Sequence, residues 1–186
     1  MSPKTVIVTG FGLFRQYTVN ASWEIAKVLP ETGIDKELNI NLVTVEIPVS
    51  YNDVDVIVPK LWADYNPILM VHLGVSHYAK ALTIETVANG HNYCNEDING
   101  ICPENTCVVD TKIETGLSID FFKENDLCIS QNAGRYLCEY IYFKSLSINK
   151  DRTIFIHVPE LDEDQTAQKL AENLKFVINK LLEQLK

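Results

Sequence analysis

The chain has 186 residues, a formal net charge of −9 and 46% hydrophobic residues. This length suits a single domain over residues 1–186, and the apolar content suffices for a sizeable core. The negative charge argues against a nucleic-acid-binding protein, which normally carries a basic face, and against attraction to an anionic membrane.

The N-terminal sequence and the cysteines both favour an intracellular protein. The start, "MSPKTVIVTGFG", lacks the long apolar core and the cleavage site of a signal peptide. No stretch reaches the roughly 20 apolar residues of a transmembrane helix. Five cysteines, an odd number without a secretion signal, indicate free thiols in a reducing compartment. We therefore expect a soluble, cytoplasmic protein.

Strands and helices alternate along the chain. Short apolar runs predict strands, and a three-to-four-residue apolar period predicts helices. In chain order, the predicted elements are strand 5–11, helix 19–29, strand 40–48, helix 51–65, strand 68–75, strand 81–88, strand 127–130, helix 135–146, strand 152–159 and helix 162–186.

Several residues mark where these helices begin and end. Asn20 is a predicted N-cap, and Pro30 follows the end of the same helix. Pro59 predicts a kink or a later start for helix 51–65. Acidic residues at the start of segment 162–186 suit the first turn of a helix. The pattern predicts an α/β fold, with a largely parallel sheet covered by helices on both faces and a site at the carboxyl ends of its strands.

Residues 89–106, "NGHNYCNEDINGICPENT", break the alternation and predict a long loop, which in a compact domain is often functional. The candidate metal ligands here are His91, Cys94 and Cys102, together with Cys107 directly after the quoted segment. Zinc sites usually use more closely paired ligands, so coincidental surface thiols are the better interpretation and we expect no metal. A non-enzymatic module whose loop at 89–107 binds a metal or a partner stays open as an alternative.

A glycine-rich turn, "VTGFGLFR", follows the first predicted strand. A dinucleotide-binding turn needs a third glycine where Arg15 stands, which argues against that function. Two interpretations remain. Phe11 and Phe14 either pack locally or form the wall of an apolar pocket.

Three residues at or near the ends of predicted elements form a candidate catalytic set. Cys138 follows the Ala-Gly step of "SQNAGRYLC", near a helix start whose dipole stabilises a thiolate. His157 lies near the end of its strand, and Glu85 lies in the strand "LTIETVA". A cysteine, a histidine and an acid can serve as nucleophile, general base and the group that orients the base.

Each of these residues also has a structural interpretation. A lone cysteine in apolar surroundings is usually a small buried hydrophobe, and a histidine in an apolar strand is usually a hydrogen-bonded core residue. His72 is a rival base, but its position deep in a strand favours a structural role. Cys128 alternates within a short strand and is predicted to lie in the core.

Seven segments together resemble the pyroglutamyl peptidase I family, and most closely its animal branch. They occur in the family's order and spacing: "VTGFGLF", "TVNASW", "EIPVSY", "HLGVS", "IETVANGHN", "SQNAGRYLC" and "FIHVP". The family consists of cysteine peptidases that remove an N-terminal pyroglutamate. The resemblance implies a single α/β/α sandwich with a mixed, twisted sheet, no metal or cofactor, pyroglutamyl peptides as substrates, and an oligomeric state between monomer and tetramer.

The resemblance also implies roles for individual residues. Cys138 matches the family's nucleophile, His157 its base and Glu85 its acid. Residues that match the pocket for the pyroglutamyl ring are Phe11, Phe14, Val49, Tyr136 and Leu137.

The chain departs from the family pattern at three places. Leu13 replaces a common proline in the glycine-rich loop, and Glu139 replaces a common asparagine after the nucleophile. Bacterial members carry an arginine, thought to assist at the oxyanion, where this chain has Asn95. These departures leave the oxyanion donors and the turnover open. They motivate a second hypothesis, a catalytically weak member that binds pyroglutamyl peptides.

Overall fold

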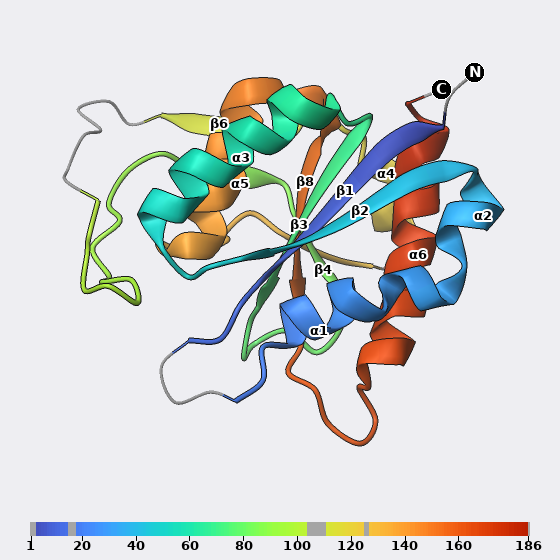
Figure 1. Ribbon diagram of the computed structural model, residues 1–186, viewed down its shortest axis with the longest axis horizontal. Coiled ribbons are helices and arrows are strands. Elements are labelled where there is room, and N and C mark those ends of the chain that lie inside the picture. Colours follow the sequence, from blue (N-terminus) through green and yellow to red (C-terminus); the bar gives the residue numbers. More distant parts are fainter. Residues whose placement is uncertain (1–2, 15–17, 104–110, 125–126, 186) are drawn as a thin grey trace.

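The computed structural model describes residues 3–14, 18–103, 111–124 and 127–185. A six-stranded sheet in the order β2-β1-β3-β8-β4-β7 forms its centre (Figure 1). Its strands are β1 Lys4–Phe11, β2 Ile40–Ile47, β3 Leu69–Val75, β4 Thr83–Glu85, β7 Cys128–Ser130 and β8 Thr153–Val158. All pairings are parallel except that between β4 and β8, so the predicted largely parallel, mixed sheet is confirmed.

Helices cover both faces of this sheet (Figure 1). The α-helices are α1 Ala21–Val28, α2 Ile34–Leu38, α3 Tyr51–Tyr65, α4 Asp120–Glu124, α5 Leu137–Asn149 and α6 Ala167–Glu183. Helices α1 and α6 contact each other over one face, and α3 and α5 contact each other over the opposite face. The predicted α/β/α arrangement is therefore the observed one. Within the described part of the chain, no helix is both long and apolar enough to span a bilayer.

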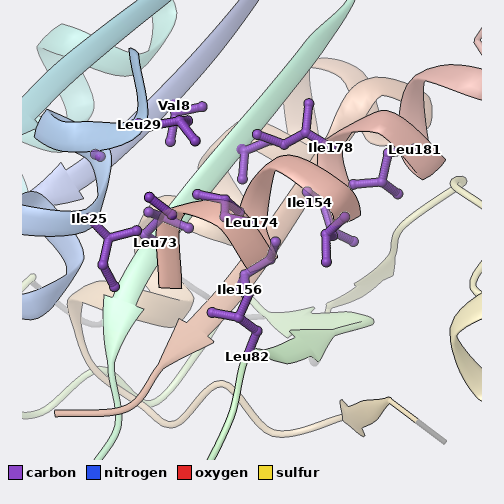
Figure 2. Packing of buried hydrophobic residues seen from close by; sticks show 14 of the residues in the cluster. Val8, Ile25, Leu29, Leu73, Leu82, Ile154, Ile156, Leu174, Ile178 and Leu181 are labelled. Atoms are coloured by element: carbon purple, nitrogen blue, oxygen red, sulfur yellow. The ribbon is translucent and has the colours of Figure 1, made fainter. Parts of the chain in front are cut away.

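The α1–α6 face is packed with aliphatic side chains (Figure 2). Ile25 of α1 and Leu174 of α6 meet Leu73 and Ile156 of the central strands, and all four are fully buried or nearly so. Because successive strand residues point to opposite faces, the neighbours of these strand residues point toward α3 and α5. The sheet thus directs His72 and Gly74 of β3 away from this core.

The α3–α5 face is aromatic and partly polar. Tyr142 of α5 packs against Phe155 of β8 with ring centroids 5.8 Å apart. Trp62 of α3 donates a 2.9 Å hydrogen bond from Nε1 to Ser145 Oγ of α5, which ties the two helices together. This face carries α5, and with it Cys138.

The helix boundaries follow the predicted caps, with two exceptions. Asn20 accepts a hydrogen bond from the Ser22 amide at the start of α1, as predicted. Pro59 lies inside a continuous α3 that starts at Tyr51, so the later start is wrong: Ser50 caps that helix by accepting a bond from the Asp53 amide. The acidic residues expected in the first turn of the last helix precede it, because α6 begins after its N-cap Thr166.

Two predictions fail around the shorter strands, and two elements there were not predicted. The single strand predicted at 81–88 is two strands, β4 and β5 Val87–Asn89, in different sheets. Strand β5 pairs with β6 Lys112–Glu114. The sequence pattern predicted neither β6 nor helix α4. Cys128 is exposed rather than in the core, because β7 is an edge strand of the sheet.

Candidate active site

Cys138 lies at the second residue of α5, directly after a tight turn. Gly134 takes a left-handed conformation there, with φ of 92°, which a residue without Cβ adopts at little cost. The first hydrogen bond of the helix runs from the Tyr140 amide to the Tyr136 carbonyl at 3.0 Å. The amides of residues 137–139 therefore precede the helical ladder and point toward its N-terminal end. Cys138 is half-buried in this first turn, and negative charge is stabilised at such a helix N-terminus.

His157 and Glu85 meet because β4 runs antiparallel to β8. Glu85 Oε1 and His157 Nδ1 are 2.7 Å apart, and both side chains are buried. The second carboxylate oxygen of Glu85 accepts a 3.2 Å hydrogen bond from the Asn132 amide. The backbone carbonyl of Glu85 accepts a 2.9 Å bond from the Tyr142 hydroxyl. The carboxylate is thus held in one orientation, with its charge directed at the imidazole.

The imidazole of His157 lies between Cys138 and Glu85. Burial by itself would lower the pKa of His157, but hydrogen bonds to Cys138 and to Glu85 outweigh burial and raise that pKa to about 9. The ring is therefore protonated at neutral pH. A cysteine, a histidine and a carboxylate in this arrangement can serve as nucleophile, acid–base residue and the group that orients the histidine.

Gly74 gives the thiol its place against the sheet. It pairs in register with His157 on the neighbouring strand β8. A Cβ at this position would lie 2.5 Å from Cys138 Sγ and 2.7 Å from Phe155 Cζ. No side chain larger than hydrogen fits there unless the thiol moves, so a glycine at this strand position allows α5 to bring Cys138 beside His157.

A cavity of about 640 Å³ opens at Cys138. All five residues predicted for the substrate pocket line it: Phe11, Phe14, Val49, Tyr136 and Leu137. The rings of Phe14 and Tyr136 lie 5.8 Å apart and are tilted by 51°. The cavity is concave, and its walls combine apolar side chains with a few polar ones such as Asn20 and Glu160, which is typical of a small-molecule site.

The loop after β5 packs behind this cavity. The Tyr136 hydroxyl donates to the Glu96 carbonyl, and the Tyr51 hydroxyl donates to the Asn95 carbonyl, each at 3.0 Å. The buried carboxylate of Asp97 accepts a 3.1 Å bond from the Tyr51 amide. The loop therefore supports Tyr136, which lines the cavity, and Tyr51, whose ring packs edge-on against Tyr136 at 6.0 Å. The sequence pattern did not single out Tyr51, Asp97 or Gly74, since each acts through contacts between distant segments.

The thiols of this loop do not form a metal site with neighbouring ligands within the described residues. Cys102 donates a 3.0 Å hydrogen bond to the Cys94 carbonyl. Cys107, the remaining cysteine of the proposed set, lies outside the described residues.

Glu139 has a structural environment that explains its presence after the nucleophile. Its side chain is fully buried and accepts bonds from the Asn89 amide at 3.1 Å and from Asn89 Nδ2 at 2.8 Å. Its other oxygen forms a 2.7 Å ion pair with Arg135. A buried carboxylate needs such partners, and the shorter asparagine side chain would carry no charge for Arg135. Glu139 therefore ties the start of α5 to the end of β5.

His72, the rival base, lies away from the cavity. It is fully buried on β3, and its Nδ1 lies 2.8 Å from Thr9 Oγ1. Burial lowers the pKa of His72 to about 3, so the ring is neutral at physiological pH. This placement agrees with the structural role expected from its position within the strand.

The profile of the pyroglutamyl peptidase family, peptidase family C15, matches residues 4–186. The chain belongs to this family. The match covers every strand and helix described above, including the elements that bring Cys138, His157 and Glu85 together.

Relatives in the pyroglutamyl peptidase family include animal proteins. Pyroglutamyl-peptidase 1 of Mus musculus is 36% identical over 96% of this chain and 90% of its own length. Pyroglutamyl-peptidase 1 of Homo sapiens is 36% identical over 98% of this chain and 91% of its own length. The predicted resemblance to the animal branch is confirmed.

Solved structures of the family share the fold. A variant of the pyrrolidone carboxyl peptidase of Pyrococcus furiosus has a TM-score of 0.81 at 23% identity, covering 98% of this chain and 100% of that chain. The enzyme from Thermococcus litoralis has a TM-score of 0.79 at 21% identity, covering 98% and 94% of the two chains. At these identities the likeness establishes the fold alone.

Proposed function

We propose that this chain is a cysteine peptidase that removes N-terminal pyroglutamate from peptides. The observation that carries the proposal is the 2.7 Å contact between Glu85 and His157 beside a thiol at a helix N-terminus, next to a cavity with aromatic walls. The family assignment adds the substrate class, because the animal relatives are pyroglutamyl peptidases. We assign Cys138 as nucleophile, His157 as acid–base residue and Glu85 as the residue that orients His157.

Substrate recognition follows from the chemistry of the lactam. Pyroglutamate is a neutral five-membered ring without a free α-amino group, so it needs an apolar slot rather than a carboxylate. The rings of Phe11, Phe14 and Tyr136 supply flat apolar surfaces for such a slot. An ordinary N-terminal residue carries a charged ammonium group, and its burial against these rings without a partner is unfavourable. The pocket therefore selects for the cyclised residue.

The reaction proceeds by acyl transfer. The Cys138 thiolate attacks the carbonyl carbon of pyroglutamate, and the amides at the start of α5 stabilise the oxyanion that forms. Each such donor raises the reaction rate by a factor on the order of 10²–10³. His157 donates its proton to the leaving amine. The shortened peptide departs, and the pyroglutamyl group remains on Cys138 as a thioester. His157 then removes a proton from water, which attacks the thioester and releases pyroglutamate.

The first test is hydrolysis of pyroglutamyl-aminomethylcoumarin by the purified protein, with prolyl- and alanyl-aminomethylcoumarin as controls of matched leaving group. We expect release of fluorophore from the pyroglutamyl compound alone. A folded protein that binds the pyroglutamyl compound without cleaving it would instead support the hypothesis of a binding member. A protein that cleaves all three compounds would contradict the selectivity proposed for the aromatic pocket.

The remaining features support a cytoplasmic enzyme that acts as a single domain. Among the described residues all four cysteines are free thiols, as in a reducing compartment. One central sheet, with its helices and a small two-stranded sheet, accounts for the described elements, which supports one domain over residues 1–186. The proposed partners are pyroglutamyl peptides, with no nucleic acid and no membrane.

Gly74→Ala is expected to lower kcat for the pyroglutamyl compound by about 100-fold, because a misplacement of about 1 Å at a reacting atom has that effect. The added Cβ would lie 2.5 Å from Cys138 Sγ and so displaces the thiol from His157. Steady-state kinetics measure the effect, and circular dichroism checks the fold. Gly116→Ala serves as the matched control, since its nearest neighbour is the exposed side chain of Asp151. Equal kcat values in the two variants would contradict the role of Gly74.

A further inference from the structure

The cavity at Cys138 is larger than the pyroglutamyl ring requires. A volume of about 640 Å³ lies within the range of about 300–1,000 Å³ that holds a ligand of drug size. A single five-membered lactam fills a small part of it. The aromatic residues of the proposed ring pocket belong to the α3–α5 face of the sheet, whereas Ala21, Val75 and Leu161 of the same cavity pack on the α1–α6 core. The cavity therefore reaches from one face of the sheet to the other at the ends of β3 and β8. We call the part lined by Ala21, Val75 and Leu161 the second compartment.

The mechanism places the leaving peptide in this second compartment. His157 must reach the leaving amine, so the residue that follows pyroglutamate lies next to the end of β8. The chain beyond β8 and the chain beyond β3 run together there, because the Ser76 amide donates a 3.0 Å bond to the Val158 carbonyl. Glu160 lies three residues after His157, and His77 lies three residues after Gly74. Both line the cavity, and Glu160 Oε1 lies 2.8 Å from His77 Nδ1.

Two of the polar side chains in this compartment are Glu160 and His77, its partner. Glu160 is the one carboxylate among the described lining residues, and neither lysine nor arginine is among them. Its side chain remains 58% exposed in spite of the contact with His77, and a carboxylate has about four acceptor positions, so it has capacity for further donors. Val19, Val75 and Leu161 add apolar surface beside it.

We propose that Glu160 selects for a lysine or arginine directly after the pyroglutamate. This inference rests on the proposed function, since it assigns the second compartment to the leaving peptide. The aliphatic stem of a long basic side chain packs on Val19, Val75 and Leu161, while its cationic end pairs with the Glu160 carboxylate. An acidic residue at the same place is repelled by the Glu160 carboxylate. The substrate class is thus pyroglutamyl peptides with a basic second residue.

The test compares three peptide amides of equal length, pyroglutamyl-Arg-Ala, pyroglutamyl-Gln-Ala and pyroglutamyl-Glu-Ala. Product release is followed by liquid chromatography and mass spectrometry. We expect kcat/KM for the arginine peptide to exceed that for the glutamine peptide by about threefold to fivefold, the size of a partly exposed ion pair. We expect kcat/KM for the glutamate peptide to be lower than that for the glutamine peptide. Raising the NaCl concentration to 0.5 M should reduce both ratios, since salt screens exposed charges.

Glu160→Gln removes the charge and keeps the size of the side chain, so the arginine-to-glutamine ratio should fall close to one. Glu163→Gln is the matched control, because Glu163 is an exposed acid of the same loop that does not line the cavity. Its ratio should equal that of the unmodified protein. Equal kcat/KM for all three peptides, or an equal fall of the arginine-to-glutamine ratio in both variants, overturns the inference and leaves the proposed function in place. Cleavage of none of the peptides overturns the proposed function and this inference together.

Discussion

Cys138→Ala is expected to lower kcat for pyroglutamyl amides by about 10⁴- to 10⁶-fold, the range seen when a nucleophile that acts with a base is removed. Without the thiol no thioester forms, and His157 loses the partner that it activates. The cavity keeps its aromatic walls, so KM for any residual activity should change little. The measurement is the steady-state rate with pyroglutamyl-aminomethylcoumarin beside the unmodified protein.

Cys128→Ala provides the control for this substitution. Cys128 is exposed on the edge strand β7 and does not line the cavity, so its removal should leave kcat unchanged. Iodoacetamide should likewise inactivate the unmodified protein by alkylating Cys138 before Cys94, Cys102 or Cys128, as peptide mass spectrometry can establish. Activity that survives in Cys138→Ala, or inactivation led by another cysteine, would remove Cys138 from the mechanism.

Glu85→Gln is expected to lower kcat by about 10³- to 10⁴-fold, as loss of the orienting carboxylate does in triads of this kind. The glutamine amide is close in shape to the carboxylate, and its carbonyl can still accept the bond from the Asn132 amide. Its NH₂ group then faces His157 Nδ1, which forces the neutral ring to carry its proton on the nitrogen that should act as base. Thermal unfolding separates this effect from a loss of fold. A kcat within tenfold of the unmodified value would show that Glu85 does not orient His157.

The same substitution should shift the pH dependence of kcat/KM. Above its raised pKa of about 9, His157 has lost the proton that the leaving amine needs, so the alkaline limb of the unmodified protein is expected near pH 9. The Glu85 charge and hydrogen bond both favour the protonated ring, and their removal lowers the pKa of His157. The alkaline limb of Glu85→Gln should therefore lie at lower pH. An unchanged limb would mean that another group sets it.

The longer elements of the fold follow from local patterns in the sequence. The apolar runs that became β1, β3 and β8 are buried on both faces, and such runs are readable without tertiary information. Helix α1 carries its cap and its stop in its own sequence. Of the three-residue strands, β7 was predicted at 127–130, whereas β4 and β5 were predicted as one strand and β6 was not predicted. So few residues show no period, and their pairing is decided by distant segments.

The candidate site was predictable in its residues but not in its contacts. Glu85 and His157 were proposed as partners, yet their meeting depends on the antiparallel pairing of β4 with β8, which no local signal encodes. Gly74 was not proposed, because its requirement arises only when α5 packs against β3. Cys128 was misplaced because alternation along a strand does not reveal that the strand lies at an edge.

The ion pair and hydrogen bonds of Glu139 bear on how the chain reaches its active state. Glu139 binds Asn89 across 50 residues of sequence, and Glu85 meets His157 across 72. Contacts of such separation form only after long loops have closed. Local helices can therefore appear early in folding without producing a site. Recovery of catalysis after dilution from denaturant thus reports completion of tertiary structure, and it should lag behind the return of helical signal.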